Sequence, residues 1–536
     1  MPNFGILLVS NRSPRSIWNL AIRIEREVAG ARIKGIVLER PTRDYDWLGD
    51  AWDRVVEFAL SVAHAYPCRR NTDKEFGVAW LSRESEQRGW KFLCADERMT
   101  AEVQEFVRNQ NADLGVMVGS PNVDAITQSI PRHGTIAFEA SVRTDAATSG
   151  DTPQPSDALD VTIEPAFDVN AVSRRISATF PSQPYDTRAA VNLKTELFCN
   201  DLAVRTIEAF SNGSAEVAEE SIAAWANSLP RFTAEAGLNA AAVALDPSRW
   251  RNRSARSLFL HTLALFSPIF IARNWYRRWR GQFPVVILFH HLVSDRPHRM
   301  GMPTEIFYRE VEFLQKYYRV VSVSEAAMIL KSGSVTAPTV VLTFDDGYED
   351  NYVNLRAISE ACGVPVSLFV STAAIDSHAE FQHDLRRGTK GFRALSWDQV
   401  RSWQSNVVEF GSHTRTHFNC GSTDLYALET EIIGSSDDMQ NRLGARPRFF
   451  AFPWGKAPNM SAPAIEIATS CYDVCFSTLA EENFAGNGTP HKVAGRKGLP
   501  ATVWELELTV QSVFEFAQSL RSREKNLEDS TPSPMS

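Results

Sequence analysis

The chain has 536 residues, which is too long for one ordinary hydrophobic core, so two or three domains are expected. Its composition, with 44% hydrophobic and 22% charged residues, is that of a water-soluble globular protein. The formal net charge of −8 gives no reason to expect nucleic acid as a partner.

The N-terminus and the cysteines both bear on the cellular compartment. The opening MPNFGILLVSNRS has no basic segment and no long apolar core, so it predicts a first strand and not a signal peptide. The seven cysteines are scattered and odd in number, which argues against a disulfide framework. Cys471 and Cys475 lie four apart without a second pair, which favours free thiols over zinc. We therefore expect a cytoplasmic protein.

Residues 1–210 alternate strand-like and helix-like runs, as expected of an α/β domain with an open, mostly parallel sheet of the Rossmann type. The strand-like runs are FGILLVS, IKGIVLE, ADLGVMVGS and GTIAFEAS, and residues 16–29 carry apolar positions at helical spacing. Residues 145–160 have the composition of a loop.

A linker is predicted over residues 211–282, and its first part, 215–248, is Ala-rich and helix-forming in part. Residues 249–280 then hold eight arginines and no acid around the apolar run SLFLHTLALFSPIFIA. That run is shorter than the roughly 20 residues of a spanning helix. Two interpretations are open: a segment that rests on anionic lipid, or a helix packed between domains with solvated arginines.

Residues 283–515 show a second strand–helix alternation, which predicts a closed or nearly closed (β/α) barrel. Its strands are FPVVILFHHL, TVVLTF, VPVSLFV, VVEFGSHT and FFAFPWG, with helices at 304–317 and 351–361. In such folds the chemistry gathers at the carboxyl ends of the strands. Residues 516–536 are expected to be a disordered tail.

Two motifs at strand ends suggest a metal site. Asp345 and Asp346 follow TVVLTF side by side, where their repulsion calls for a cation. His413 and His417 leave another strand with the four-residue spacing that lets two imidazoles reach one ion. One carboxylate and two imidazoles would form a three-ligand site with room for water, and the second carboxylate could remove the proton of that water. A solvated acidic turn is the alternative for the aspartates alone.

The third motif is RFFAFPWGK, residues 448–456. A Pro-Trp-Gly turn after a strand can present backbone N–H groups to the oxyanion of a tetrahedral intermediate. Trp454 could also stack on a sugar face, and we expect Tyr348, Phe452 and Pro453 to join it in contacting substrate. A purely structural turn is the alternative.

TFDDGY, HTRTH and FAFPWG, in this order and spacing, resemble the polysaccharide deacetylases with a NodB homology domain. The resemblance covers about 283–515 and implies a distorted (β/α) barrel that removes an acetyl group from an acetylated sugar. It implies Asp346, His413 and His417 as ligands of a divalent metal, often zinc, with cobalt and manganese as other choices. Asp345 matches the general base, and the backbone near Trp454 would serve the oxyanion.

One departure concerns the general acid, because HKVAGRKGLP lacks the Leu-His pattern of that family's last motif. Arg496 fits an arginine that some members carry there. His290, His291 or His491 could donate the proton to the leaving amine; of these His290 matches the aromatic-His pair that ends the family's first strand.

Residues 112–141 are similar to the core of folate-dependent formyltransferases. Ala137 and Glu139 stand where that family carries Asn and His, so residues 1–210 are expected to form a formyltransferase-like domain without transferase activity. The leading hypothesis is a metal-dependent deacetylase of an acetylated sugar, either free or lipid-linked. The alternatives are a non-catalytic sugar-binding protein and a bifunctional deacetylase/formyltransferase acting on amino sugars.

Overall fold

The computed structural model describes most of the chain in separate ranges. They are residues 4–10, 14–39, 78–95, 100–118, 135–143, 160–169, 172–175, 178–181, 188–212, 267–296, 298–403, 407–485, 493–500 and 503–512. The predicted loop at 145–160 lies outside the described residues except for Asp160, which begins a strand, and so do the linker residues 213–266 and the predicted tail at 516–536.

The N-terminal half is built on an open sheet of eight strands. These are β1 (Phe4–Ser10), β2 (Ala31–Glu39), β3 (Lys91–Ala95), β4 (Leu114–Val118), β5 (Thr135–Arg143), β6 (Asp160–Val169), β7 (Val172–Arg175) and β8 (Ala178–Pro181). The order is β3-β2-β1-β4-β5-β6-β7, with β8 also on β6. The strands from β3 to β5 pair in parallel, whereas β6 pairs antiparallel with β5, β7 and β8. The predicted α/β sheet is therefore confirmed, with an antiparallel extension that the sequence analysis missed.

The helices described in this half are α1 (Pro14–Glu27), α3 (Val78–Gln87), α4 (Thr100–Gln110) and α5 (Arg188–Asn212). Helix α1 buries Ile17, Leu20 and Ile24, whose spacing of three and four residues puts them on one face. This face packs against buried side chains of β1, β2 and β4, such as Ile6 and Val116. The amphipathic pattern that predicted the helix thus also fixes which side faces the sheet.

The C-terminal half contains a parallel sheet of nine strands and a short pair, β10–β11. The strands are β9 (Val285–His290), β10 (Leu292–Val293), β11 (Gly301–Met302), β12 (Arg319–Val320), β13 (Thr339–Phe344), β14 (Val366–Val370), β15 (Val408–Ser412), β16 (Phe449–Ala451), β17 (Val474–Phe476), β18 (Val493–Ala494) and β19 (Lys497–Gly498). The helices are α9 (Ser267–Arg280), α10 (Thr304–Tyr317), α11 (Val323–Lys331), α12 (Asp350–Cys362), α13 (Thr372–Ser377), α14 (Gln382–Leu385), α15 (Trp397–Trp403), α16 (Leu425–Leu443), α17 (Ala462–Cys471) and α18 (Val503–Val510), with a 3-10 turn η2 (Ala457–Asn459).

The order of this sheet is that of a nearly closed barrel. It runs β18-β17-β16-β15-β14-β13-β9-β19, with β12 also on β13, and every pair within it is parallel. The two end strands, β18 and β19, do not pair with each other in the described residues, so backbone hydrogen bonds between them do not close the barrel. Since all strands run the same way, their carboxyl ends meet at one rim, as the sequence analysis expected.

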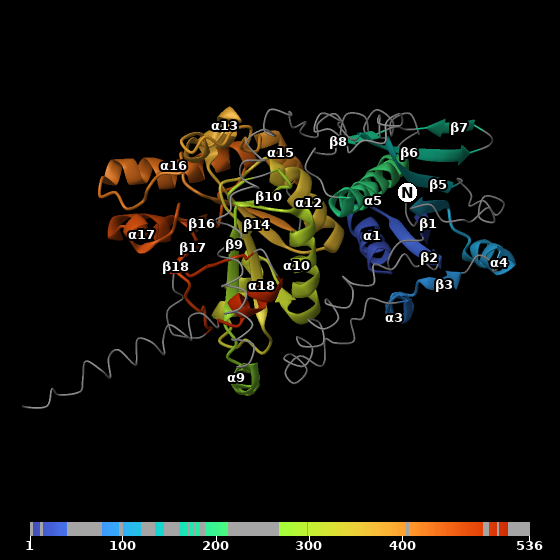
Figure 1. The fold of residues 1–536 in the computed structure, drawn as a ribbon, viewed down its shortest axis with the longest axis horizontal. Coiled ribbons are helices and arrows are strands. Elements are labelled where there is room, and N and C mark those ends of the chain that lie inside the picture. Colours follow the sequence, from blue (N-terminus) through green and yellow to red (C-terminus); the bar gives the residue numbers. More distant parts are fainter. Residues whose placement is uncertain are drawn as a thin grey trace, which may run out of the picture.

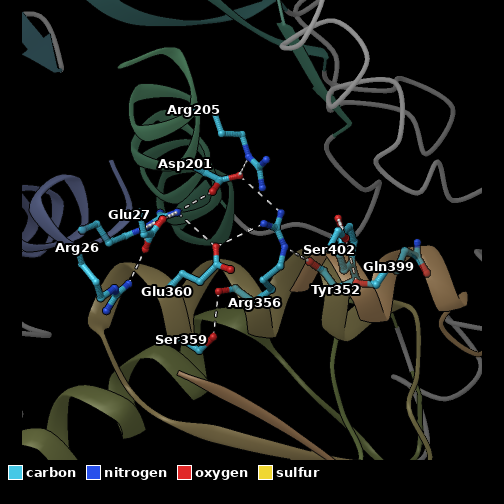
Figure 2. A network of polar contacts seen from close by, with 11 residues as sticks. Arg26, Glu27, Asp201, Arg205, Tyr352, Arg356, Ser359, Glu360, Gln399 and Ser402 are labelled. Carbon is cyan, nitrogen blue, oxygen red and sulfur yellow. Dashed lines mark hydrogen bonds and ion pairs between the residues drawn. The ribbon is translucent and has the colours of Figure 1, made fainter. Parts of the chain in front are cut away.

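Figure 1 shows the two halves side by side, with α1 and α5 between the N-terminal sheet and α12. Charged side chains are buried where these three helices meet (Figure 2). Arg23 contacts Asp201 at 2.8 Å and Glu360 at 3.3 Å, and Arg356 contacts the same two acids at 3.5 and 3.4 Å. Arg23 of α1 thus reaches Glu360 of α12, and Arg356 of α12 reaches Asp201 of α5, so ion pairs cross between the two halves.

Helix α9 is the described part of the Arg-rich segment. On one side Asn274 donates to Gln511 at 2.7 Å and Arg277 pairs with Glu482 at 2.9 Å. On the other side Trp275 and Trp279 are 63% and 73% exposed. Among the described helices, none combines the length and apolarity needed to cross a bilayer.

Candidate metal centre and cavity

The two aspartates are set apart by a tight turn at the end of β13. This strand is buried along its whole length between β9 and β14, so Asp345 and Asp346 begin where the core ends. Asp346 has φ 72° and Gly347 has φ 88°, both in the left-handed region. A Cβ on Gly347 would lie 2.9 Å from Val370 Cγ1 and would have to displace it. Gly347 is therefore required for the turn that sends the two carboxylates to different partners.

The two histidines leave β15 on a loop that is held by a carboxylate of α16. Glu431 accepts hydrogen bonds from the backbone N–H groups of Arg415 and Thr416, both at 2.9 Å, and from the Thr416 hydroxyl at 2.8 Å. Thr414 and His417 adopt positive φ angles of 64° and 57°. The loop thus brings His417 back to the same side as His413.

Asp346, His413 and His417 offer ligand atoms within 4.8 Å of one another. Asp346 Oδ1 lies 3.5 Å from His413 Nε2 and 3.2 Å from His417 Nε2. The predicted three residues therefore meet at one point in space, at the rim where the strands of the C-terminal sheet end.

The donor set fits a divalent cation. Asp346 Oδ1 is buried and receives no well-aligned hydrogen bond, although His417 Nε2 is near it. His413 Nδ1 lies 2.7 Å from the carbonyl oxygen of Ala451, so it donates there and leaves the lone pair of Nε2 available to a cation on the side of Asp346. Two imidazole nitrogens and one carboxylate are ligands that zinc accepts at a site with an open position.

The protonation states suit metal binding. Burial lowers the pKa of His413 to about 4, so its imidazole is neutral near pH 7. Burial alone would raise the pKa of Asp346, but the neighbouring imidazoles, His417 first, bring that pKa below its usual range. A neutral imidazole and an ionised carboxylate are the forms that coordinate metals.

Asp345 is held by Arg496. Its two carboxylate oxygens accept hydrogen bonds from Nη1 and Nη2 at 2.6 and 2.8 Å. Arg496 is fully buried and also donates to Ser477 O and Thr343 Oγ1, so its position is fixed. Burial would raise the pKa of Asp345, but the guanidinium outweighs this effect and the pKa falls below its usual range. Asp345 is therefore ionised and oriented beside the metal ligands.

These groups line a cavity of about 340 Å³. Its wall includes Asp345, Asp346, His413, His417 and Trp454. The Trp454 ring is 45% exposed, and its centroid lies 4.4 Å from that of His417 at an interplanar angle of 71°. Within the described part of the chain, the backbone N–H of Trp454 donates no hydrogen bond to a protein acceptor. The cavity wall thus combines the candidate metal ligands, the Asp345 carboxylate and Trp454.

Several residues expected at the site lie behind the cavity wall. Phe452 is buried against Phe450, and Pro453 is buried too. The buried Tyr348 donates from its hydroxyl to Asp384 at 2.7 Å. These three side chains therefore support the site from its core and do not reach the cavity as a substrate contact would.

The candidate general acids are separated by strand alternation. Phe289 and His291 line the cavity, whereas His290 points to the opposite side, edge-on to Phe344. Successive side chains on a strand face opposite ways, which explains the difference. Burial lowers the pKa of His290 to about 3, so it does not carry a proton near pH 7. Of the three expected candidates, His290 therefore does not line the cavity, His291 does, and His491 lies outside the described residues.

The sequence analysis missed His383 of α14. Its Nε2 lies 2.8 Å from the Tyr348 hydroxyl and 3.8 Å from Asp346 Oδ2, and the ring lines the cavity. Burial lowers its pKa. A signal existed, because His383 follows the strand VPVSLFV through a short helix, and loops after strand ends carry the chemistry in such folds.

Comparison with known proteins relates part of the chain to a family. Residues 332–470 match the polysaccharide deacetylase family model. This match confirms the resemblance that the three motifs suggested, and it includes Asp345, Asp346, His413, His417 and Trp454. The N-terminal half lies outside it.

Two curated relatives are similar to part of the chain. The YxkH protein of Bacillus subtilis is 21% identical over 182 residues, which is 34% of this chain and 60% of that protein. The poly-beta-1,6-N-acetyl-D-glucosamine N-deacetylase of Escherichia coli is 24% identical over 236 residues, or 37% of this chain and 34% of that protein. The chain therefore spans 60% and 34% of the lengths of these relatives.

Solved structures similar to the chain include a structure of IcaB from Ammonifex degensii. It is 20% identical with a TM-score of 0.37, over 42% of this chain and 97% of that one. For the N-terminal half they include glycinamide ribonucleotide transformylase 1 from Symbiobacterium toebii. That structure is 12% identical with a TM-score of 0.25, over 39% of this chain and 89% of that one.

Proposed function

We propose that the protein is a metal-dependent hydrolase that removes an acetyl group from an N-acetylated sugar. The observation that carries this proposal is the buried Asp346 Oδ1, which has two imidazoles beside it and, among the described residues, no arginine or lysine partner. The family match of residues 332–470 supports the reaction class.

Asp346, His413 and His417 would hold the divalent ion. When bound, such an ion supplies Lewis-acid chemistry, because it polarises a carbonyl and lowers the pKa of water. Zinc suits this nitrogen and oxygen donor set, and cobalt and manganese are further candidates.

Asp345 would act as the general base. It accepts a proton from the attacking water, whose oxygen forms a bond to the acetyl carbon. Arg496 keeps the carboxylate ionised and oriented for that transfer. The Trp454 N–H would donate to the carbonyl oxygen as negative charge develops there.

His291 would complete the reaction. It lines the cavity next to the metal ligands, where it could give a proton to the sugar nitrogen as the C–N bond breaks. Acetate and an amino sugar are the products. Trp454 offers its exposed ring as a stacking surface for the sugar.

Metal analysis and an acetate assay on purified protein test the proposal. The protein is loaded with zinc, cobalt or manganese and given N-acetylated oligosaccharides. We expect wild type to retain about one ion and to release acetate, and His413→Ala to lose both. His378→Ala, which alters a histidine outside the cavity, is the control and should behave as wild type. Sugar binding without acetate release by metal-loaded wild type would favour a non-catalytic binding protein.

We also propose that α9 contacts an anionic lipid surface. Trp275, Tyr276 and Trp279 are exposed on this helix together with Arg278 and Arg280. Aromatic side chains beside arginines are typical of helices that lie at a bilayer surface. We expect wild type to sediment with anionic vesicles at low salt, and Trp275→Ser/Trp279→Ser to stay in the supernatant. Unchanged sedimentation of that variant would contradict the role of α9.

A further inference from the structure

The cavity carries three positive side chains that the proposed reaction does not use. Arg299 precedes β11, Arg387 follows α14, and Lys456 follows the Trp454 turn. All three are exposed and line the same cavity of about 340 Å³ as Asp345 and Asp346. Three loops that are distant in sequence therefore bring positive charge to one opening.

These cations have no carboxylate partner among the described residues, as neither a salt bridge nor a side-chain hydrogen bond joins any of them to an acid. Other arginines near the rim behave differently. Arg296 pairs with Asp350, Arg415 pairs with Asp438 at 2.8 Å, and Arg496 pairs with Asp345 at 2.6 Å.

The acids of the cavity do not cancel this charge. Arg496 already matches Asp345. A divalent ion held by Asp346 would add more positive charge than that single carboxylate removes. With a divalent ion bound, the cavity would therefore carry a net positive charge, and a positively charged cavity attracts and orients anions.

Two of the three loops are fixed to each other. Asp384 Oδ2 lies 3.1 Å from His298 Nε2, next to Arg299, and accepts a hydrogen bond from the Tyr348 hydroxyl. The Arg387 N–H donates to the Asp384 carbonyl oxygen at 2.9 Å. Asp384 thus contacts both segments that carry the arginines, and these contacts fix the distance between the backbones at Arg299 and Arg387.

We propose that Arg299, Arg387 and Lys456 form a binding site for a phosphate group on the acetylated sugar. The proposal rests on the proposed deacetylase function, because it identifies the substrate of that cavity as an N-acetyl sugar phosphate. A phosphate ester with a charge near −2 and several acceptor oxygens matches three cations better than one carboxylate does. Since the cavity has the volume of a small ligand, the phosphate must be on the acetylated unit or the next one.

Binding can be measured without turnover in the Asp345→Asn background. Calorimetry compares N-acetylglucosamine 1-phosphate with methyl N-acetylglucosaminide, which lacks the charge. We expect the phosphate to bind at least about tenfold more tightly, with a preference that weakens as salt rises. Equal affinity for the two probes would overturn the proposal, as would equally tight binding of an N-acetylated uronic acid.

Paired variants assign the preference to the three side chains. Arg387→Gln with Lys456→Gln should remove most of the phosphate preference, and adding Arg299→Gln should remove the rest. Arg386→Gln is the matched control, because Arg386 is exposed beside Arg387 but does not line the cavity. A preference that survives the triple change, or that the control also loses, contradicts the assignment.

The source of the phosphate is a further arm of the same experiment. If a short prenyl ester of the sugar phosphate binds more tightly than the free compound, the phosphate belongs to a lipid carrier; equal binding indicates a soluble sugar phosphate.

Failure of the deacetylase function is separable from failure of this inference. Phosphate preference without acetate release defeats only the function, whereas acetate release at equal rates from both probes, without binding preference, defeats only the inference.

Discussion

Two groups of buried charges in this protein differ in how they are neutralised. Where the two halves meet, Arg23 and Arg356 match Asp201 and Glu360, and the guanidinium groups hold the pKa of Asp201 below its usual range despite burial. At the rim of the C-terminal sheet, Asp346 stays ionised among histidines, of which His413 is neutral near pH 7. In the first group each carboxylate has arginine partners, whereas among the described residues no arginine or lysine pairs with Asp346. The difference distinguishes a structural charge network from a site that is prepared for a ligand.

Glu310 of α10 shows that an unmatched carboxyl is not enough to indicate a site. It is fully buried, and neither oxygen has a hydrogen-bond partner among the described residues. Burial and the nearby Glu505 raise its pKa well above the usual range, so it holds a proton. Asp346 is different because its pKa is lowered and imidazole nitrogens surround it. The combination of retained charge and available ligands is what makes Asp346, His413 and His417 a candidate metal centre.

The largest expected effect is that of Asp345→Asn on catalysis. Removing the general base should lower kcat by about 10²–10⁴-fold, while the metal content stays that of wild type. Acetate release and metal analysis on one preparation check this. Asp473→Asn, which alters an exposed acid paired with Arg448, is the control. A wild-type rate in Asp345→Asn would remove the proposed mechanism.

The next effect concerns the charge network between the halves. Arg356→Ala leaves Asp201 and Glu360 short of a buried cation, so we expect a loss of about 3–5 kcal/mol in the free energy of unfolding. The exposed Arg448–Asp473 pair provides the comparison, because Arg448→Ala should cost at most about 1 kcal/mol. Urea unfolding of both variants measures the difference, and equal losses would mean that the network is not structural.

Glu310→Met tests the carboxyl that is neutral by protonation. Replacing it with an apolar side chain of similar length should stabilise the fold by about 1–3 kcal/mol at pH 8. Because the folded pKa of Glu310 is raised, the contribution of this one side chain to wild-type stability is most favourable below the usual glutamate pKa of about 4.3 and declines as pH rises. The gain in the variant should therefore shrink as pH falls toward that value. Glu466→Met, on the exposed side of α17, should show no such pH dependence.

The smallest effect is expected for Arg496→Lys. Lysine keeps the charge but cannot form the two parallel hydrogen bonds, so the pKa of Asp345 should rise and kcat should fall by about tenfold. Since the base must be ionised, the acid limb of the pH–rate profile should move to higher pH. An unchanged limb with lower kcat would indicate that Arg496 only supports the fold.

Much of the fold follows from local patterns in the sequence. The helix predicted at 304–317 has the same bounds as α10, and TVVLTF is β13, because apolar periodicity and β-branched runs record which faces are buried. The antiparallel strands β6 to β8 were missed since their pairing depends on contacts distant in sequence. Asp345, Asp346, His413 and His417 could be found because they sit in short motifs at strand ends.

The rest of the site could not be read from those motifs. The difference between His290 and His291 depends on which way a strand end points, and a shift of one residue reverses it. His383, Arg299 and Arg387 come from loops whose positions are set by contacts such as that between His298 and Asp384. Tyr348 and Phe452 belong to recognisable motifs, yet their side chains point into the core and not into the cavity.

The position of α9 has a consequence for how substrate arrives. This helix leads directly into the amino end of β9, whereas the cavity lies beyond the carboxyl end of the same strand, so the two are at opposite poles of the C-terminal half (Figure 1). If the protein were anchored to a bilayer through α9, the opening of its cavity would face the aqueous phase. Such an orientation suits a sugar delivered from solution, or one whose carrier is long enough to extend around the barrel.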